Sequence, residues 1–271
     1  MRAESYAGFS PRRVGAMVLR YLYLLRGSWP RVLELAYWPT VQMILWGFIT
    51  RFLMTESTTI GQAAGLLISG VLLWDVLFRS QLGVSVVFFE EMHSRNLGHL
   101  FVSPLRPYEL TLSLMTISAL RTLIGVGAAS ALALPFYGYR ITDLGLPLIG
   151  FFANLMIFGW SVGLMVAALV LRHGLGAESL AWIAIFALAP ISGIYYPLDI
   201  LPDWLQPVAW LLPSGHVFEG MRAVLLDGAF RADLMVGAVV LNLVYLGLGM
   251  GLFLYAFKVA RRRGLLLQVG E

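Results

Sequence analysis

The sequence predicts an all-α integral membrane protein. Of its 271 residues, 59% are hydrophobic and only 13% are charged, and the mean hydropathy is +0.80. Soluble domains carry about 25% charged residues. Several apolar runs reach the ~20 residues that a helix needs to cross a bilayer. We therefore expect a single membrane domain of six transmembrane helices, with an amphipathic interfacial helix before them and a re-entrant helical pair between the fifth and sixth spans.

The charge pattern indicates contact with a membrane rather than with nucleic acid. The formal net charge is +4, and it comes from arginine because Lys258 is the single lysine. Arginine at the edges of membrane spans reports orientation and contact with anionic lipids. The chain has no cysteine, so we expect neither a disulfide nor a thiolate metal site. The histidines show no metal-ligand spacing: His93, His99, His173 and His216.

Residues 1–31 predict a basic amphipathic helix that lies in the membrane interface. Apolar side chains recur along it at helical spacing: Val14, Met17, Val18, Tyr21, Leu22 and Leu25. Arginines run through the same segment: Arg2, Arg12, Arg13, Arg20, Arg26 and Arg31. Because of these arginines the segment is not a secretory signal. We favour a cytoplasmic anchor over a role with the substrate.

Residues 32–257 predict the transmembrane domain. The spans are expected at 32–54, 60–89, 108–135, 144–171, 178–195 and 234–257. Gly150, Gly159 and Gly163 in the fourth span would let it pack closely on a neighbouring helix. A basic cytoplasmic tail, residues 258–271, follows the last span.

Three ionisable side chains fall well inside these spans, away from the span ends, where a charge is costly. Asp75 and Arg79 lie four residues apart, so they share a helix face and can neutralise each other. A structural pair and a transport role fit that spacing equally well. Arg121, near the middle of the third span, requires a carboxylate, a carbonyl or water, and both Asp75 and Glu178 are candidates.

Residues 90–105 interrupt the apolar pattern between the second and third spans. Glu90 and Glu91 end one span, a short amphipathic segment follows, and Ser103-Pro104 ends that segment. A short helix of this kind can lie along the membrane face and dock into a partner's groove. Its apolar anchors would be Leu97, Leu100 and Phe101. The alternative is a plain loop between spans.

Residues 192–228 consist of apolar pieces that are too short to cross a bilayer and too apolar for a solvated loop. Their prolines remove backbone donors and interrupt helices: Pro197, Pro202, Pro207 and Pro213. We expect a pair of short helices at about 197–228 that enters one face of the membrane and returns. Broken backbone at that depth needs protein or a water-filled cavity around it. The alternative is an interfacial hairpin that plugs the bundle.

The same two segments carry a family resemblance. The order of residues in the later one is Gly193, Tyr195-Tyr196-Pro197, Leu201-Pro202-x-Trp204-Leu205, Pro213 and Glu219-Gly220-x-Arg222. It closely resembles the C-terminal half of type 2 ABC export permeases, which are membrane subunits that pair with a separate ATPase. In that family the earlier segment holds a coupling helix, and this chain keeps the following positions of its pattern: Glu90, Glu91, Leu97, Leu100, Ser103, Pro104 and Leu105. It departs from the pattern with Arg95-Asn96 where Gly-Thr is usual and with Gly98 where Glu is usual.

The resemblance implies a transport subunit without an active site of its own. Two permease subunits, as a homodimer or a heterodimer with a related permease, would pair with two cytoplasmic ATPase subunits. These would contact residues 90–105, Arg95 included. The chain has no GxxxxGK[ST] phosphate loop, so ATP and Mg²⁺ would be bound by the partner. The re-entrant segment would form an outer gate that closes through Tyr195, Tyr196, Leu201 and Trp204, with the Glu219–Arg222 pair holding its return helix.

Arginine placement predicts that both termini are cytoplasmic, because the 95–106 loop and the turn at 172 are richer in arginine than the opposite side. We expect a bacterial inner membrane. The substrate would be hydrophobic or amphiphilic, either a drug-like molecule or a lipid, with a polysaccharide or glycolipid as the alternative. A motor-independent secondary transporter is disfavoured because the intramembrane charges are few and nearly cancel. A non-transporting assembly factor of the cell envelope is the third hypothesis.

Overall fold

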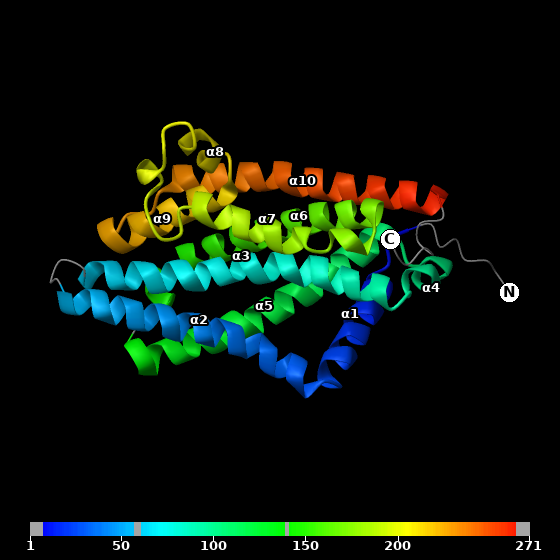
Figure 1. Cartoon of the computed structure of the whole chain (residues 1–271), viewed down its shortest axis with the longest axis horizontal. Coiled ribbons are helices and arrows are strands. Elements are labelled where there is room, and N and C mark those ends of the chain that lie inside the picture. The colour runs from blue at the N-terminus through cyan, green and yellow to red at the C-terminus, as the bar shows by residue number, and fades with distance from the viewer. Residues whose placement is uncertain (1–7, 57–60, 139–140, 264–271) are drawn as a thin grey trace.

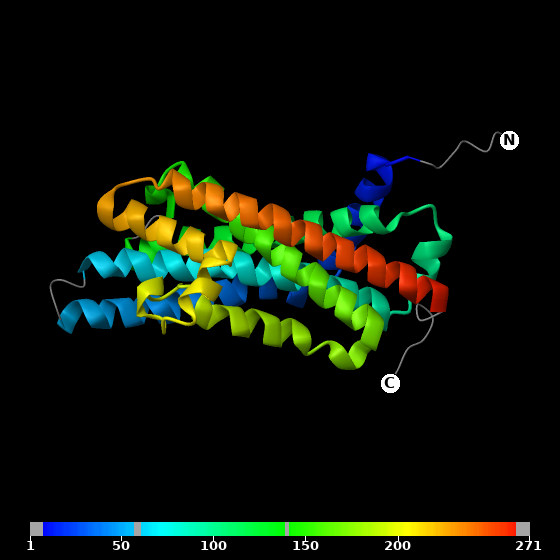
Figure 2. The same ribbon diagram turned by 90° about the horizontal axis from the view of Figure 1, so that it is seen from above.

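The computed structural model describes residues 8–56, 61–138 and 141–263, and all regular structure in these ranges is helical (Figure 1). The long helices lie along one common axis, with α4 at one end and α8 nearer the other (Figures 1 and 2). In order, the elements are α1 Pro11–Arg26, α2 Trp29–Glu56, α3 Gly61–His93, α4 Leu97–Val102, α5 Pro107–Tyr137, η2 Ile141–Leu144, α6 Pro147–His173, η3 Leu175–Ala177, α7 Leu180–Leu188, η4 Ala189–Ile191, η5 Leu198–Ile200, α8 Gln206–Trp210, α9 Pro213–Asp227 and α10 Ala232–Arg263.

Within the described residues, five helices are long and apolar enough to cross a bilayer. They are α2, α3, α5, α6 and α10, and they correspond to the first four predicted spans and the sixth. Their bounds extend the predicted ones by a few residues at most ends; the third span, for example, is Pro107–Tyr137. The all-helical, membrane-spanning fold class is confirmed in this coarser form.

The predicted fifth span is a shorter helix. α7 covers Leu180–Leu188 and continues into η4, Ala189–Ile191. At 1.5 Å per residue this stretch rises about 18 Å, which is less than the ~30 Å hydrocarbon core. Pro190 lies in its last turn, and Gly193 with φ +68° turns the chain away from the helix axis. Six spans and a re-entrant pair are therefore not confirmed and stay predictions.

Glycine sets the distance between α3 and α6 at the centre of the bundle. A Cβ at Gly159 would lie 2.7 Å from the carbonyl oxygen of Leu77, and one at Gly163 would lie 2.7 Å from that of Gln81. Gly249 of α10 approaches the carbonyl oxygen of Ser161 on the other side of α6 in the same way. Any side chain at these positions would force the helices apart.

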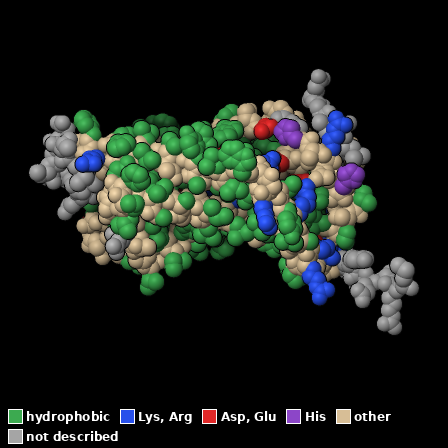
Figure 3. All heavy atoms as spheres, turned by 90° about the horizontal axis from the view of Figure 1, so that it is seen from below, with side chains coloured by type: hydrophobic (Ala, Val, Ile, Leu, Met, Phe, Trp, Pro, Cys, Tyr) green, Lys and Arg blue, Asp and Glu red, His purple; other side chains and the backbone are tan. Residues whose placement is uncertain are grey.

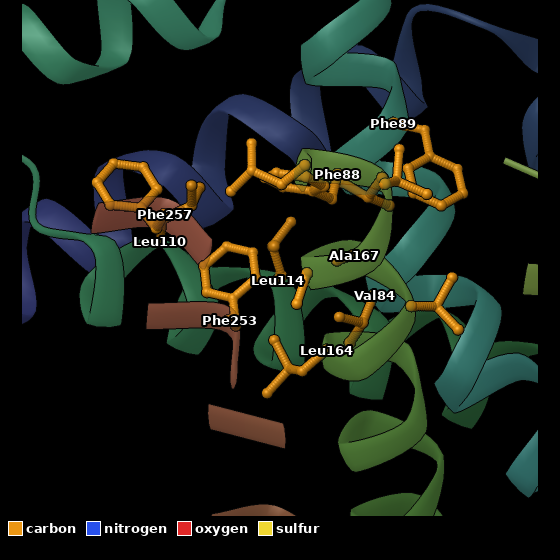
Figure 4. Close-up of a cluster of buried hydrophobic side chains, with 14 of the residues drawn as sticks. Val84, Phe88, Phe89, Leu110, Leu114, Leu164, Ala167, Phe253 and Phe257 are labelled. Atoms are coloured by element: carbon orange, nitrogen blue, oxygen red, sulfur yellow. The ribbon is translucent and has the colours of Figure 1, made fainter. Parts of the chain in front are cut away.

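The largest buried cluster lies where α3, α5, α6 and α10 converge near the α4 end (Figure 4). Phe88 and Phe253 meet edge to face there, with their ring centroids 5.3 Å apart. Leu110 and Leu114 of α5 belong to the same cluster. This packing fixes the end of α3 and the start of α5, the two points between which α4 is suspended.

The buried stripe of α1 packs on protein. Val14, Met17, Tyr21 and Leu25 are buried, and the middle two belong to the cluster that holds α3 and α5. The opposite side of α1 leaves Leu19, Tyr23 and Leu24 exposed. α1 thus has one apolar side docked on the bundle and another that is free to contact lipid.

The surface has the polarity of a membrane protein. Apolar side chains cover most of the face shown in Figure 3, and most of its Lys, Arg and His side chains lie toward the end that carries α4. The exposed end of α10, with Lys258 and Arg261 to Arg263, adds basic side chains.

Candidate functional site

The first candidate site is the α4 segment, which is anchored on one side and open on the other. Leu97 and Leu105 are buried, and Leu100 packs partly against the same cluster. Val102 is 91% exposed, and Ser103 and Pro104 after it are exposed too. Phe101 belongs to α4, but its side chain lies outside the described part of the structure. α4 therefore presents an exposed edge away from the bundle, on which Val102 is the large apolar side chain among the described residues.

Backbone geometry explains why the family pattern has glycine at the position of Arg95. Just after α3, Arg95 lies in the left-handed region, φ +55°. The amide of Asn96 donates to the carbonyl of Glu91 at 3.0 Å, and that of Arg95 to the carbonyl of Met92 at 3.0 Å. These two bonds form a Schellman motif, whose left-handed position is usually glycine. Glycine is also what the resemblance places here.

We therefore expect Arg95→Gly to stabilise the protein by roughly 0.5–1 kcal/mol. A left-handed conformation costs a non-glycine residue about 1–2 kcal/mol, and the added chain entropy of glycine offsets roughly 0.5–1 kcal/mol of that. Unfolding in detergent micelles measures the change. Ser94→Gly is the control, because Ser94 is not in the left-handed region, and it should lower stability. A lower unfolding midpoint for Arg95→Gly would contradict the explanation.

The two carboxylates before α4 face α1 and α2. Glu91 is 2% exposed, and its carboxylate pairs with Arg20 of α1. Glu90 lies 3.6 Å from the guanidinium of Arg31, and both of these side chains are partly exposed. Glu91 is therefore placed to hold α1 rather than to touch a docked partner directly.

Glu109, the corresponding carboxylate after α4, was not among the site residues predicted from the sequence. It is 0% exposed, and it accepts from Arg13 Nε at 2.8 Å and Nη2 at 2.6 Å. The backbone amides of Ser10 and Arg106 also donate to it, at 2.8 and 3.0 Å. The hydrogen bonds to Glu109 raise the pKa of the Arg13 guanidinium. The available signal was a glutamate at the third helical position after Pro107, which is typical of a helix start.

Together these ion pairs attach α1 to the helices on both sides of the α4 segment. Arg13 and Arg20 lie seven residues apart, two turns along one face of α1. One holds Glu109 at the start of α5 and the other holds Glu91 near the end of α3. A displacement of α4 is therefore bound to act on α1 as well as on α3 and α5.

The second candidate site is the outer segment, residues 192–228. Arg222 is buried and donates to the carbonyls of Tyr196, at 2.7 Å, and Gly193, and to Glu219 Oε1 at 2.8 Å. The same Glu219 oxygen accepts from the amide of Leu198 at 2.8 Å. The Glu219–Arg222 pair on α9 thus holds the turn that begins the segment.

The structure does not bring the four predicted gate residues into one contact. Tyr195 stacks on Trp46 of α2, with ring centroids 4.5 Å apart. Leu201 is buried in a small cluster with Tyr196 packed against it, whereas Trp204 is 74% exposed. The remaining residues of the predicted set divide in the same way: Leu205 is partly buried, Pro213 starts α9 as a buried residue, and Pro197 and Pro202 are exposed.

A cavity of about 400 Å³ lies beside the outer segment. Its lining is mixed: Glu219 and Arg222 share it with Asp199, Arg231 and apolar side chains such as Trp210. Because the lining combines apolar surface with charges of both signs, the cavity suits an amphiphile better than a purely apolar molecule.

Of the three intramembrane charges, Asp75 and Arg79 form an ion pair with each other, whereas Arg121 has no ionic partner among the described residues. Arg79 Nε donates to Asp75 Oδ2 at 2.5 Å, and both side chains are largely buried. Glu178, the other partner considered for Arg121, lies 3.6 Å from His93 Nε2. Within the described residues, neither carboxylate pairs with Arg121, and Arg121 Nε is buried without a hydrogen-bond partner.

Comparison with known proteins identifies the family of this chain. A family model described as ABC-2 type transporter matches residues 23–226. Linearmycin resistance permease protein LnrN of Bacillus subtilis (strain 168) is 33% identical over 76 residues, which are 27% of this chain and 19% of that relative. The chain thus matches less than a fifth of the relative's length. The family match runs from α1 through α4 and the outer segment into α9, and the chain therefore belongs to the ABC-2 type transporter family as a membrane permease subunit.

Proposed function

We propose that this chain is the permease of an ATP-driven exporter that works with a separate cytoplasmic ATPase. Family membership supports the proposal. ATP and Mg²⁺ would be bound by the ATPase, and this chain would supply the path across the membrane. Both termini and α4 would then face the cytoplasm, which agrees with the basic residues at that end of the bundle.

The observation that carries the proposal is the exposed edge of α4. A docking helix needs apolar side chains that its own protein does not cover, and Val102 is such a residue. The segment that carries Val102 is held in place, because Leu97 before it and Leu105 after it are buried in the core. A partner that binds Val102 would therefore displace α3 and α5 and not only the loop between them.

We further propose that two permeases pair, as two copies or with a related chain. α2 is the span whose side chains are least buried, and its outer face carries large apolar residues such as Trp38 and Phe48. Substrate would move between the paired subunits and leave past the outer segment, with Tyr195 stacked on Trp46 of α2 where that path ends.

The substrate class that we propose is a hydrophobic or amphiphilic molecule. The mixed lining of the outer cavity supports this class. The matching relative carries linearmycin resistance in its name, which is compatible with an amphiphilic cargo. An ion relay is not favoured, because Asp75 and Arg79 neutralise each other at 2.5 Å.

The test is ATPase docking by a Val102→Asp variant. The chain is reconstituted in liposomes with a candidate partner ABC ATPase, and binding and ATP hydrolysis are measured. Losing one well-packed apolar contact costs about 1.5 kcal/mol, so we expect the ATPase to bind about tenfold more weakly. Val102 contacts no core, so folding should not change. Val236→Asp, on the exposed side of α10 away from α4, is the control. If the ATPase binds neither the wild type nor the variant, the proposal is wrong.

A further inference from the structure

Arg121 is a guanidinium that the described chain leaves unsatisfied. It lies in α5 and is half-buried, and its Nε is buried without an acceptor. No ion pair or hydrogen bond to its other nitrogens occurs among residues 8–56, 61–138 and 141–263. A guanidinium has five N–H donors and no acceptor. A buried donor left without a partner loses its hydrogen bonds to water and gains none in return, which is unfavourable.

The charges around Arg121 do not provide that partner. Glu90 attracts Arg121, but Glu90 already lies 3.6 Å from Arg31. Arg31 repels Arg121, and Glu34 attracts it without forming an ion pair with it. Arg31 is therefore paired with Glu90, and Arg121 is left without an ionic partner among the described residues.

Helical spacing places Arg121 at the margin of the protein. One turn further along α5, Gly125 packs against the carbonyl of Leu35 on α2 and against Arg79, so this side of α5 faces α2 and α3. The neighbouring side carries Leu120 and Ile124, both exposed apolar residues. Arg121 therefore lies at the boundary between the protein-facing and the lipid-facing sides of α5, close to the turn that joins α1 to α2.

We propose that Arg121 binds the anionic head of an amphiphile, a phosphate or a carboxylate, at the level where α2 begins. A phosphate or carboxylate oxygen accepts from a guanidinium through two parallel N–H donors. The hydrocarbon chain of the ligand lies along Leu120 and Ile124. Glu90 remains paired with Arg31, so Arg121 supplies the positive charge of the site. The ligand is either a resident anionic lipid or a single-chain anionic amphiphile, and the proposal does not depend on the ATPase.

The experiment measures binding of two probes to the full chain in phosphatidylcholine bilayers: pyrene-labelled phosphatidylglycerol and a pyrene-labelled fatty acid. Energy transfer from the tryptophans reports proximity, and pyrene-labelled phosphatidylcholine gives the baseline. One charge-assisted bidentate contact corresponds to about tenfold in affinity. Arg121→Gln should therefore weaken the anionic probes about tenfold and leave the baseline unchanged, and Arg121→Lys should retain part of the affinity. Arg172→Gln removes an exposed arginine at the end of α6 and should have no effect.

The two probes distinguish the sources. Binding of phosphatidylglycerol alone assigns the site to a lipid, and binding of the fatty acid alone assigns it to a single-chain amphiphile. Equal binding by wild type and Arg121→Gln, or an equal loss in Arg172→Gln, overturns the proposal. A second reading needs no variant: unlabelled phosphatidylglycerol should displace its probe from the wild type about tenfold better than phosphatidylcholine does. Equal displacement by both lipids also overturns the proposal.

Discussion

Replacing Arg222 with alanine will release the start of the outer segment from α9 and lower the free energy of unfolding by about 3 kcal/mol. The guanidinium satisfies two backbone carbonyls, of Gly193 and Tyr196, together with the Glu219 carboxylate. Its removal leaves Glu219 partly buried with the amide of Leu198 as its remaining partner. Breaking a buried pair from one side costs more than the pair itself contributes, because an uncompensated charge remains.

Arg222→Lys should not restore stability, because a single ammonium cannot reach three acceptors that a planar fork reaches together. Arg231→Ala is the matched control. Arg231 lies 2.6 Å from Asp233, which is closer than the 2.8 Å between Arg222 and Glu219, but both side chains are more than half exposed. Exposed pairs contribute little, so this variant should unfold like the wild type. The comparison separates the effect of burial from that of distance.

Hydrogen exchange and heat unfolding measure the outcome. In Arg222→Ala the amides of residues 193–198 should lose protection while those of α3 and α6 keep theirs, because the bundle core does not involve Arg222. Unchanged protection at 193–198 would show that the outer segment is held by its own apolar cluster of Leu198, Leu201 and Ala209, and the role assigned to Arg222 would then be wrong.

The sequence predicted the long helices well, because an apolar run of sufficient length has few alternatives in a bilayer. It did not predict where α7 ends. The residues at 178–195 are almost all apolar, so their composition does not mark the break after Ile191. The break follows from Pro190 and the positive φ of Gly193, and also from the hydrogen bonds by which Arg222 holds the chain 26 and 29 residues away.

The ionic contacts of the α4 segment show the same limit. Helical spacing identified the stripe of α1, and the end of the apolar span together with the family pattern identified the carboxylates before α4. The pairs themselves join residues 71 and 96 positions apart, and a sequence pattern carries no information about such partners. Arg13 and Arg20 therefore looked like ordinary basic residues of an interfacial helix, and Glu109 like part of a span.

Reversing the charge of Glu91 should uncouple α4 from the bundle more severely than any exposed α4 variant. In Glu91→Arg a second guanidinium is buried beside Arg20, and like charges in a buried site repel strongly. We expect ATP hydrolysis that depends on the permease to fall by about thirtyfold to a hundredfold. The double variant Arg20→Glu, Glu91→Arg should recover most of it, with a coupling energy of about 2–3 kcal/mol.

The double variant decides between two roles for Glu91. If Glu91 touches the ATPase directly, exchanging the two charges changes the docked surface and activity stays lost. If Glu91 acts through α1, the exchange restores the pair and activity returns.

A distance measurement gives a second test of the same question. Because the chain has no cysteine, spin labels at Gly15→Cys and Arg172→Cys report the distance from α1 to the end of α6 without interference from other thiols. Both sites are exposed. That distance should widen in Glu91→Arg and return in the double variant. If the distance is restored but ATP hydrolysis is not, Glu91 contacts the ATPase directly. Val102 would then be one of at least two residues of this chain that bind the ATPase.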